Sequence, residues 1–352
     1  MSKACMQSTL RRSAMIVLAA ACLPTTAFAQ DGGRLNAVAL ESRTNGAAGQ
    51  LAAAYWRQAD SSIARVRDDR VLWRFHYGGE LDKPYFHPLA MPDGCVLTWN
   101  APADHAWHHG LWFSWKFING VNYWESSSGS GRADGATTCS GVHVDAHPDG
   151  SATIAMAVSY GPRGDQPALL QERRTMQVSA PDAAGDYHID WISAFTAAED
   201  VTLDRSPPQP GAAGGYAGLS VRLAENLAER VATNVEGPVA FDSGDRHRGA
   251  SVAMDYSGVV EGKSGGIAIL DHPRNPRSPT PWYVIRLPVI SYMNAAVLND
   301  APLRLAAGEQ LTLRYRICIH SGRWQAEQLR EAYAAFAGDA TATQPSTAAG
   351  EK

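Results

Sequence analysis

Short runs in which hydrophobic and polar residues alternate dominate the chain, and clusters of Gly, Pro, Asp and Asn separate them. Between Ala64 and His320 these runs include VLWRFHY, ATIAMAVSY, YHIDWISAF, WYVIRLPVI and LTLRYRICIH. Alternation with a period of two is typical of a β-strand that buries one face. Frequent short strands with almost no helical run between them predict an all-β fold, a large antiparallel β-sandwich.

One helix is expected, near the C-terminus, in GRWQAEQLREAYAAFAG. Its apolar residues recur at helical spacing and form one stripe, which consists of Ala326, Leu329, Tyr333 and Phe336. Gly338 is expected to end the helix, because glycine commonly follows a helix end. Residues 339–352 have nothing to bury and are expected to be a disordered tail.

The runs share one character on both sides of the Pro/Gly-rich stretch 206–215, which favours a long loop within one domain over a domain boundary. We therefore expect a single sandwich domain over residues 61–338. Residues 30–60 are small and polar, which predicts either a flexible segment or an exposed first strand.

The first 29 residues have the features of a secretory signal peptide. A basic start precedes an apolar run from Ala14 to Leu23, and a small-x-small site ends at Ala29. Cleavage after Ala29 predicts a periplasmic or secreted protein. The alternative is a lipoprotein acylated on Cys22. The apolar run is too short to span a bilayer, and we expect no span after it.

The composition bears on two questions: whether the protein binds nucleic acid, and whether disulfides or a structural metal stabilise its fold. Basic residues number 31 and acidic residues 35, without a long basic run, so nucleic acid is not expected as a partner. Removal of the leader would leave Cys95, Cys139 and Cys318, which allows one disulfide with one thiol, or three buried thiols. No CxxC or Cys/His zinc spacing occurs, so the fold should rest on its core.

The stretch DHAWHHGLWFSWKFINGVNYWE, residues 104–125, is the densest in chemistry. Asn119-Gly120 lies between alternating runs and predicts a two-residue type I′ hairpin turn. That turn would pair Ile118 with Val121, Lys116 with Tyr123, and Ser114 with Glu125. Alternation would then place Trp112, Ser114, Lys116, Tyr123 and Glu125 on one face, and Leu111, Phe113, Trp115, Phe117 and Trp124 on a core face.

The first face combines aromatic rings with polar groups, as a sugar site requires. The preceding strand would add His108 to this face and His109 to the core face, and a bulge at Gly110 would exchange them. A histidine can move protons without a metal near neutral pH. Asp104 could hold one imidazole in a single tautomer.

A metal site is the alternative use of the HxxHH cluster, because His105, His108 and His109 could converge on one divalent ion in a turn. The cluster lacks the glutamate-containing spacing of the zinc-peptidase helix. We therefore expect no cofactor and keep a divalent metal as the open alternative.

Other segments could line the same site. Lys83 and Tyr85 lie in LDKPYFHPL, and Asp271 and His272 lie in a proline-rich loop after an apolar run. Such a loop could form a second wall. Glu172 could face the site, although a pair with a neighbouring arginine is the simpler interpretation.

These motifs, with GYAGLSVRLAE, MDYSG and GIAILDHPRNPRSPTPWYV, resemble the bacterial PmoA-like family, which carries a methane-oxygenase label. The expected β-structure does not suit an oxygenase of the membrane. That family is similar to galactose mutarotase-like proteins, whose antiparallel β-supersandwich binds sugars on a concave sheet. The resemblance implies a histidine acid, from His105, His108 or His109, and a glutamate base, Glu125 or Glu172.

Together these features predict an exported enzyme that hydrolyses, eliminates or epimerises a saccharide or glycan fragment. The catalytic candidates are His105, His108, His109 and Glu125. The candidates for substrate binding are Lys83, Tyr85, Asp104, Trp112, Arg222, Asp271 and His272. A carbohydrate-binding protein without catalysis, or a metal-binding protein, is the alternative. The bound sugar and the oligomeric state are left open.

Overall fold

The computed structural model describes residues 54–127, 129–164, 166–209 and 213–342. All of them belong to one compact unit of the chain, Leu35–Lys352. The expected signal peptide, most of the segment 30–60 and residues 343–352 lie outside the described residues. The first described strand begins at Ala54, inside the segment for which a first strand was one of two expectations.

A nine-stranded antiparallel sheet contains the hairpin's first strand, and its order is β1-β2-β3-β4-β5-β13-β20-β19-β16. Its strands are β1 (Ala54–Ala59), β2 (Ser62–Arg67), β3 (Arg70–His76), β4 (Tyr85–Leu89), β5 (Leu111–Ser114), β13 (Gly218–Arg222), β16 (Arg246–Ala250), β19 (Pro281–Leu287) and β20 (Ile290–Ala295). We call it the first sheet.

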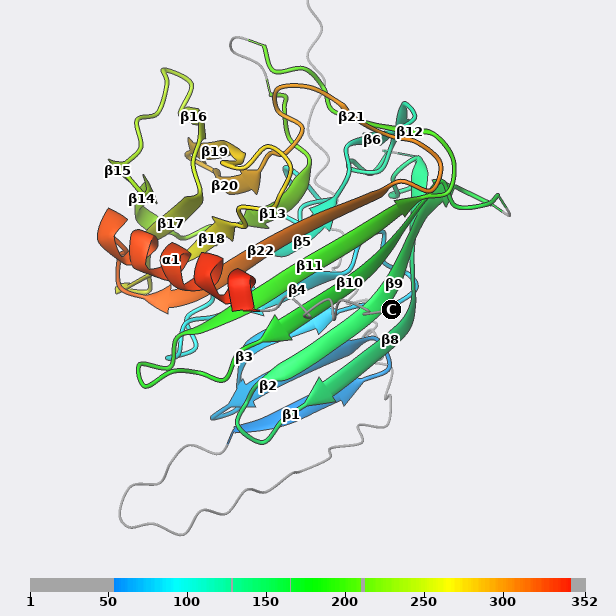
Figure 1. Ribbon diagram of the computed structural model, residues 1–352. Coiled ribbons are helices and arrows are strands. Elements are labelled where there is room, and N and C mark those ends of the chain that lie inside the picture. Colours follow the sequence, from blue (N-terminus) through cyan, green and yellow to red (C-terminus); the bar gives the residue numbers. More distant parts are fainter. Residues whose placement is uncertain (1–53, 128, 165, 210–212, 343–352) are drawn as a thin grey trace, which may run out of the picture. The chain divides into compact units, whose positions relative to one another are not determined.

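The second sheet also has nine antiparallel strands, in the order β15-β14-β17-β18-β22-β11-β10-β9-β8. Its strands are β8 (Gly135–Ala146), β9 (Ala152–Pro162), β10 (Leu170–Val178), β11 (Tyr187–Ala197), β14 (Ala228–Asn234), β15 (Gly237–Pro238), β17 (Ala253–Val260), β18 (Lys263–Asp271) and β22 (Gln310–Ser321). Figure 1 shows β8 to β11 and β22 as long strands side by side.

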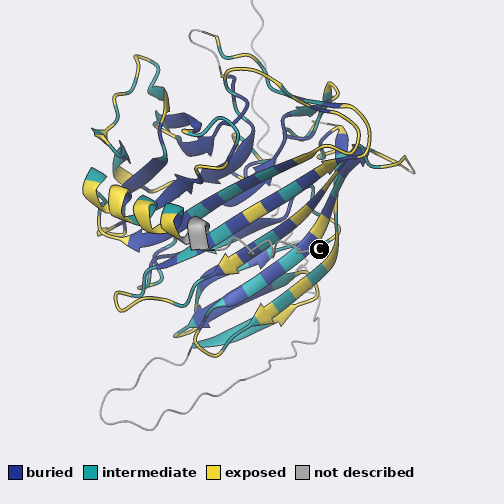
Figure 2. Cartoon of the chain, viewed as in Figure 1, coloured by how far each residue is buried: buried dark blue, intermediate teal, exposed yellow. Residues whose placement is uncertain are grey.

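The two sheets share one hydrophobic core. Phe86 of the first sheet lies 6.3 Å from Trp191 of the second, and Phe113 lies 5.5 Å from Phe195, between ring centroids. Burial alternates along β10, where every second residue from Leu170 is buried (Figure 2). The expected sandwich of antiparallel sheets is therefore confirmed, because period-two patterns require a partner for each buried face.

A small four-stranded sheet holds the hairpin's turn. Its strands are β6 (Phe117–Ile118), β7 (Val121–Asn122), β12 (Val201–Asp204) and β21 (Leu303–Leu305), in the order β21-β12-β6-β7. The loop between β12 and β13 contains the Pro/Gly-rich stretch.

The helix α1, Ala326–Ala342, packs against β17, β18 and β14 through Leu329 and Phe336, both buried (Figure 1). It runs past Gly338, so the expected stop there is wrong. A side chain at Gly338 would meet no atom within 4 Å, and nothing at this position forces the helix to end. Residues 339–342, expected in the tail, continue the helix.

Cys95, Cys139 and Cys318 are free thiols, and Cys95 and Cys318 are buried. Of the two arrangements expected for these cysteines, the structure has the one without a disulfide, although Cys139 is only half-buried. Within the described ranges, we find no helix with the length and apolar character needed to cross a bilayer.

Candidate functional site

A hollow lies on the face of the first sheet that points away from the shared core, with a volume of about 430 Å³ including the open space at its mouth. Three of the candidate residues line it, together with aromatic side chains. Its lining consists of His105, Trp107, His108, Trp124, Glu125, Ala213, Tyr216, Tyr283, Ile285, Ile290 and Tyr292. The aromatic rings give the hollow apolar walls, and the imidazoles and the carboxylate are its candidate groups for proton transfer.

The hairpin that carries this chemistry has the expected register next to its turn, but the expected pair of Ser114 with Glu125 is not formed, because Ser114 pairs with Gly218 and the strand ends at Asn122. Ile118 pairs with Val121, and the Tyr123 amide donates a hydrogen bond to the Lys116 carbonyl at 3.0 Å. Asn119 and Gly120 both have positive φ, as a type I′ turn requires.

The faces of the hairpin's last residues are exchanged relative to the expectation. Tyr123 lies in the shared core, and Trp124 lines the hollow. The strand ends at Asn122, whose Oδ1 accepts hydrogen bonds from the amides of Trp124 (2.9 Å) and Glu125 (3.3 Å). This turn breaks the alternation, and it brings Trp124 and Glu125 to the same side.

His105 is the best-prepared acid or base in the hollow. Its Nδ1 lies 2.8 Å from Oδ2 of Asp104, and a carboxylate can only accept, so Nδ1 carries the proton. Nε2 is then the ring nitrogen available to a bound molecule. Arg222, buried on β13, donates to Oδ1 and Oδ2 of Asp104 at 3.1 and 3.0 Å.

Asp104 is therefore fixed from two sides. Partial burial alone would raise the pKa of this carboxyl, but hydrogen bonds and charge from His105 and Arg222 lower it overall. Arg222 itself is fully buried and also donates to the Val289 carbonyl at 2.7 Å, so it positions Asp104 rather than a ligand.

His108 forms part of the floor of the hollow. Its ring stacks on Tyr292 at 5.2 Å and on His105 at 4.6 Å, and lies 5.0 Å from Trp112. Burial, and then the neighbouring charges, hold its pKa well below the ordinary value. A neutral imidazole in this position can support His105 through its ring face.

His109 is not brought into the hollow. Its ring stacks on Tyr85 at 4.7 Å, and its Nδ1 lies 2.9 Å from Oδ1 of Asn100. Burial, and then the positive charge of Lys83, lowers the pKa of His109 to about 3. Gly110 has a φ of 43°, which breaks the alternation beside both histidines. His108 thus lies on the expected face, beside Trp112, whereas His109 was expected on the core face and instead packs on Tyr85 of the same outer cluster.

The three imidazoles of the HxxHH cluster do not converge on one point. Nδ1 of His105 is engaged by Asp104, and His109 faces Tyr85 and Asn100. Among the residues that the structure describes, no group of three His, Cys, Asp or Glu side chains is arranged to hold a metal ion.

Glu125 faces the hollow with both carboxylate oxygens oriented by neighbours. The Tyr216 hydroxyl donates to Oε1 at 2.8 Å, and the Lys116 ammonium forms an ion pair with Oε2. Burial, and then the charge of Glu125, raises the pKa of Tyr216, so this phenol stays a donor. Each carboxylate oxygen keeps a second lone pair for a bound molecule.

Lys83 lies behind the hollow and does not line it. Its buried ammonium donates to the carbonyls of Trp124 (2.6 Å) and Trp107 (3.2 Å), so it joins two walls. Burial lowers its pKa to about 8.

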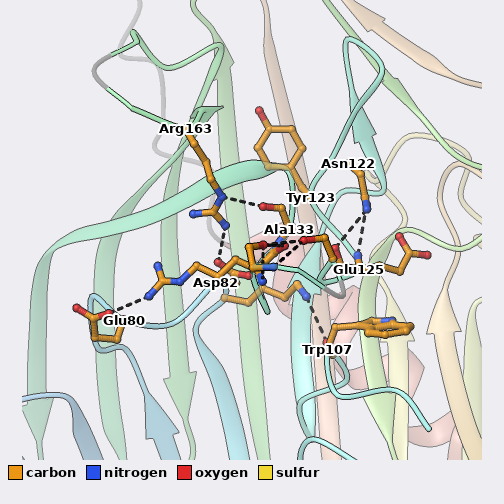
Figure 3. A network of polar contacts seen from close by, with 12 residues as sticks. Glu80, Asp82, Trp107, Asn122, Tyr123, Glu125, Ala133 and Arg163 are labelled. Atoms are coloured by element: carbon orange, nitrogen blue, oxygen red, sulfur yellow. Dashed lines mark hydrogen bonds and ion pairs between the residues drawn. The ribbon is translucent and has the colours of Figure 1, made fainter.

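The segment after Glu125 is anchored by a neighbouring network (Figure 3). Asp82 accepts from the Ala133 amide and from Arg163, both at 2.9 Å, and Arg163 also donates to the Ala133 carbonyl. Asn122 lies beside Glu125 in the same view. The hairpin end that presents Glu125 is thus held on both sides.

Trp112 was expected to stack on a ligand, but it is fully buried beneath His108 and Trp124. The rings that line the hollow are Trp107, Trp124, Tyr216, Tyr283 and Tyr292. Tyr283 and Tyr292 come from β19 and β20, and the sequence analysis did not single them out. Their only signal was alternation on an apolar strand.

Three other candidates lie elsewhere. Glu172 is buried between the sheets, where it pairs with Arg174 at 2.7 Å. Asp271 is buried and accepts from the Thr280 amide at 3.0 Å, and burial raises its pKa to about 6. His272 lines a separate groove on the second sheet.

In fold, the chain is similar to solved sugar-enzyme structures at low identity. An alpha-galactosidase from Lactobacillus brevis matches with a TM-score of 0.39 and 9% identity, over 77% of this chain and 39% of that one. A galactose mutarotase related enzyme from Lactobacillus acidophilus matches with a TM-score of 0.39 and 7% identity, over 78% of this chain and 99% of that one. A putative kojibiose phosphorylase from the human microbiome matches with a TM-score of 0.28 and 9% identity, over 58% of this chain and 23% of that one.

This chain thus spans less than half of the alpha-galactosidase and of the phosphorylase. No curated protein matches the sequence. Residues 62–334 match the model of a family described as a family of unknown function, DUF6807. The match covers both sheets from β2 onward and most of α1, and the chain belongs to this family.

Proposed function

We propose that this protein is a carbohydrate-active enzyme that transfers protons to and from a saccharide in the aromatic hollow. The observation that carries the proposal is the Asp104-oriented His105, which shares one hollow with Glu125. Indole and phenol rings can pack on the apolar faces of a sugar, and a few polar groups can fix its orientation.

The two titratable groups suit opposite roles. The Glu125 carboxylate can accept a proton from a hydroxyl, a C–H group or a water molecule. His105 can donate a proton from Nε2 to a ring or leaving-group oxygen, because the Asp104 carboxylate stabilises the imidazolium. Hydrolysis, elimination and epimerisation of sugars all use such a pair. The choice among them depends on the saccharide.

We further propose that this activity is periplasmic or extracellular, because residues 1–29 have the sequence features of a secretory signal peptide. The mass of the mature protein recovered from the producing cell tests this placement. Cleavage after Ala29 would support it, acylation of Cys22 would make the protein a lipoprotein, and an intact leader in the cytoplasm would contradict it.

A panel of oligosaccharides, with product analysis by mass spectrometry and NMR, tests the activity. The wild-type protein, the variants His105→Ala and Glu125→Gln, and the control His147→Ala are compared. His147 lies in a turn outside the hollow. We expect conversion by the wild type and the control, with a loss of at least about 100-fold in both variants. Binding without conversion by the wild type would instead show a carbohydrate-binding protein.

A further inference from the structure

The aromatic hollow continues as an apolar surface along the hairpin formed by β19 and β20. Tyr283, Ile285 and Leu287 alternate along β19 and therefore share a face. Ile285 pairs with Tyr292 of β20, and Leu287 pairs with Ile290. All five side chains pack in the outer cluster of the first sheet. We call Ile285, Leu287 and Ile290 the apolar strip, and it leads from the hollow to the turn of the hairpin.

The turn at the end of the apolar strip exposes a further apolar side chain. Val289 is 61% exposed, and it is one of two large hydrophobic residues that are exposed in the described chain. Its carbonyl accepts a hydrogen bond from the buried Arg222 at 2.7 Å, and the Leu287 carbonyl accepts one from Arg230 at 2.6 Å. Two guanidinium groups thus fix the backbone of this turn next to the hollow.

The two titratable groups of the proposed activity lie at opposite ends of β13. Tyr216 lies just before this strand, and its hydroxyl donates to Glu125 at 2.8 Å. Arg222 is the last residue of the strand and holds Asp104, which orients His105. The same guanidinium binds the hairpin turn. His105 is therefore the group nearer to the apolar strip, and Glu125 is the group farther from it.

The apolar strip cannot satisfy the hydroxyl groups of a saccharide. Ile285 and Ile290 line the hollow, but their side chains have no hydrogen-bonding atom. Burial of a hydroxyl group without a partner is unfavourable, whereas burial of apolar atoms is favourable. The half-buried indole of Trp107 adds apolar surface. The hollow thus has a part that suits a sugar, around Glu125 and His105, and a part that suits an apolar group.

We propose that the substrate is a glycoside with an apolar aglycone, an aromatic ring or an alkyl chain, and that the apolar strip binds this aglycone. The inference rests on the proposed function, because it names the substrate class of the same hollow. The sugar lies between Glu125 and His105. The glycosidic oxygen lies beside His105, at the border between the two parts of the hollow.

Calorimetric titration with matched glycosides tests the proposal. The probes are the methyl, octyl and 4-nitrophenyl glycosides of glucose, galactose, mannose and xylose, each in both anomeric forms. Wherever the wild type converts a probe, the Glu125→Gln protein is titrated, so that binding alone is measured. We expect at least one octyl or 4-nitrophenyl glycoside to bind about tenfold or more tightly than the methyl glycoside of the same sugar. The tighter of the two shows whether the strip prefers a chain or a ring.

Two variants and a control locate the apolar contact. Ile290→Thr places a hydroxyl group in the strip. Val289→Ser changes an exposed side chain and tests the proposal even if Ile290→Thr folds poorly. The control is Ile192→Thr, because Ile192 is also an exposed large hydrophobic residue, at 39%, but lies on β11 of the second sheet. We expect the preference for the apolar aglycone to fall about fivefold in Ile290→Thr, to fall less in Val289→Ser and to persist in the control.

Two results would overturn the proposal. One is that no octyl or 4-nitrophenyl glycoside binds more tightly than its methyl counterpart. The other is that Ile290→Thr and Val289→Ser both keep the full preference of the wild type. Failure of the proposed function gives a different result, in which the apolar glycosides bind with the expected preference but remain unconverted. Conversion of saccharides without any such preference would support the proposed activity and remove the apolar aglycone.

Discussion

Asp104 accepts a hydrogen bond from Nδ1 of His105 at 2.8 Å and is itself held by the buried Arg222. The sheet thereby fixes one tautomer of a histidine that lies in a loop before β5. This series of hydrogen bonds, from a buried cation through a carboxylate to an imidazole, orients a proton donor without burying it. His105 keeps 34% of its side chain exposed, and a substrate can reach it.

Asp104→Asn should weaken the support that residue 104 gives to the His105 imidazolium, while leaving the hollow in place. An amide can accept from Nδ1, but it carries no charge to stabilise the imidazolium. We expect kcat to fall about tenfold or more, with a smaller change in KM and an altered pH profile. The control is Asp145→Asn. Asp145 lies on β8, outside the hollow, and its Oδ2 is 3.8 Å from Nε2 of His147, so this change also removes a carboxylate beside a histidine. Equal losses in the two variants would argue against an orienting role.

The Tyr216 hydroxyl should affect catalysis only through its hydrogen bond to Glu125. Tyr216→Phe removes the 2.8 Å hydrogen bond to Oε1 and keeps the ring in the wall. We expect a decrease in kcat of about tenfold to 100-fold, since a hydrogen bond to a charged group contributes about 1.5–3 kcal/mol. In the Glu125→Gln background the same change should have little further effect. Additive losses in the double variant would contradict this coupling.

Trp107 should contribute binding rather than chemistry, because its half-buried indole forms a wall of the hollow. Trp107→Ala should raise KM or Kd for the saccharide by about tenfold, with kcat less affected. Trp56→Ala is the matched control, since Trp56 is also half-buried but packs on Trp73, away from the hollow. If both variants bind the saccharide equally well, the wall assignment is wrong.

The hairpin and the sandwich could be predicted from the sequence because both depend on local patterns. Asn119-Gly120 fixes the register, and alternation fixes which faces are buried. The exchange of Tyr123 and Trp124 could not be predicted, because it depends on where the strand ends and on the Asn122 side chain. An Asn two residues before Trp124 is a weak signal of such a turn.

The walls of the hollow could not be predicted because they come from distant segments. Tyr283 and Tyr292 reach the hairpin only because β20 pairs with β13 and β13 pairs with β5. The same pairing explains why Arg222 supports Asp104. Asp271 and His272 were expected to form a second wall because their proline-rich loop follows an apolar run, but that run is β18, which belongs to the other sheet.

Gly110 should be essential for folding near the site. It has a φ of 43°, and a Cβ atom there would lie 2.2 Å from the Phe86 carbonyl oxygen. Gly110→Ala should lower the free energy of unfolding by about 3 kcal/mol or more. The alanine would adopt a strained positive φ, and the backbone at Phe86 would also have to move to make room for the Cβ atom. Gly120→Ala is the control: its φ is 80°, but a Cβ atom would meet nothing within 4 Å. There we expect a loss of about 1 kcal/mol. Similar losses in denaturant titrations would contradict the close approach.

Lys83 should make stability depend on pH under alkaline conditions. Its pKa is about 8 in the folded chain, against an ordinary value of 10.5. Between these values the unfolded chain binds more protons, so the contribution of Lys83 to the free energy of unfolding rises with pH and is lost as pH falls toward 8. Raising the pH from 8 to 9.5 should favour the wild type over Lys83→Met by up to about 2 kcal/mol. A difference that stays constant in denaturant titrations would exclude the effect.

The crystal structure of the Glu125→Gln variant with the saccharide that the wild type converts is the most direct measurement. We predict a sugar ring packed against the aromatic walls of the hollow, with one of its oxygens about 3 Å from Nε2 of His105. A saccharide bound outside this hollow, with His105 and residue 125 both out of its reach, would contradict the proposed chemistry.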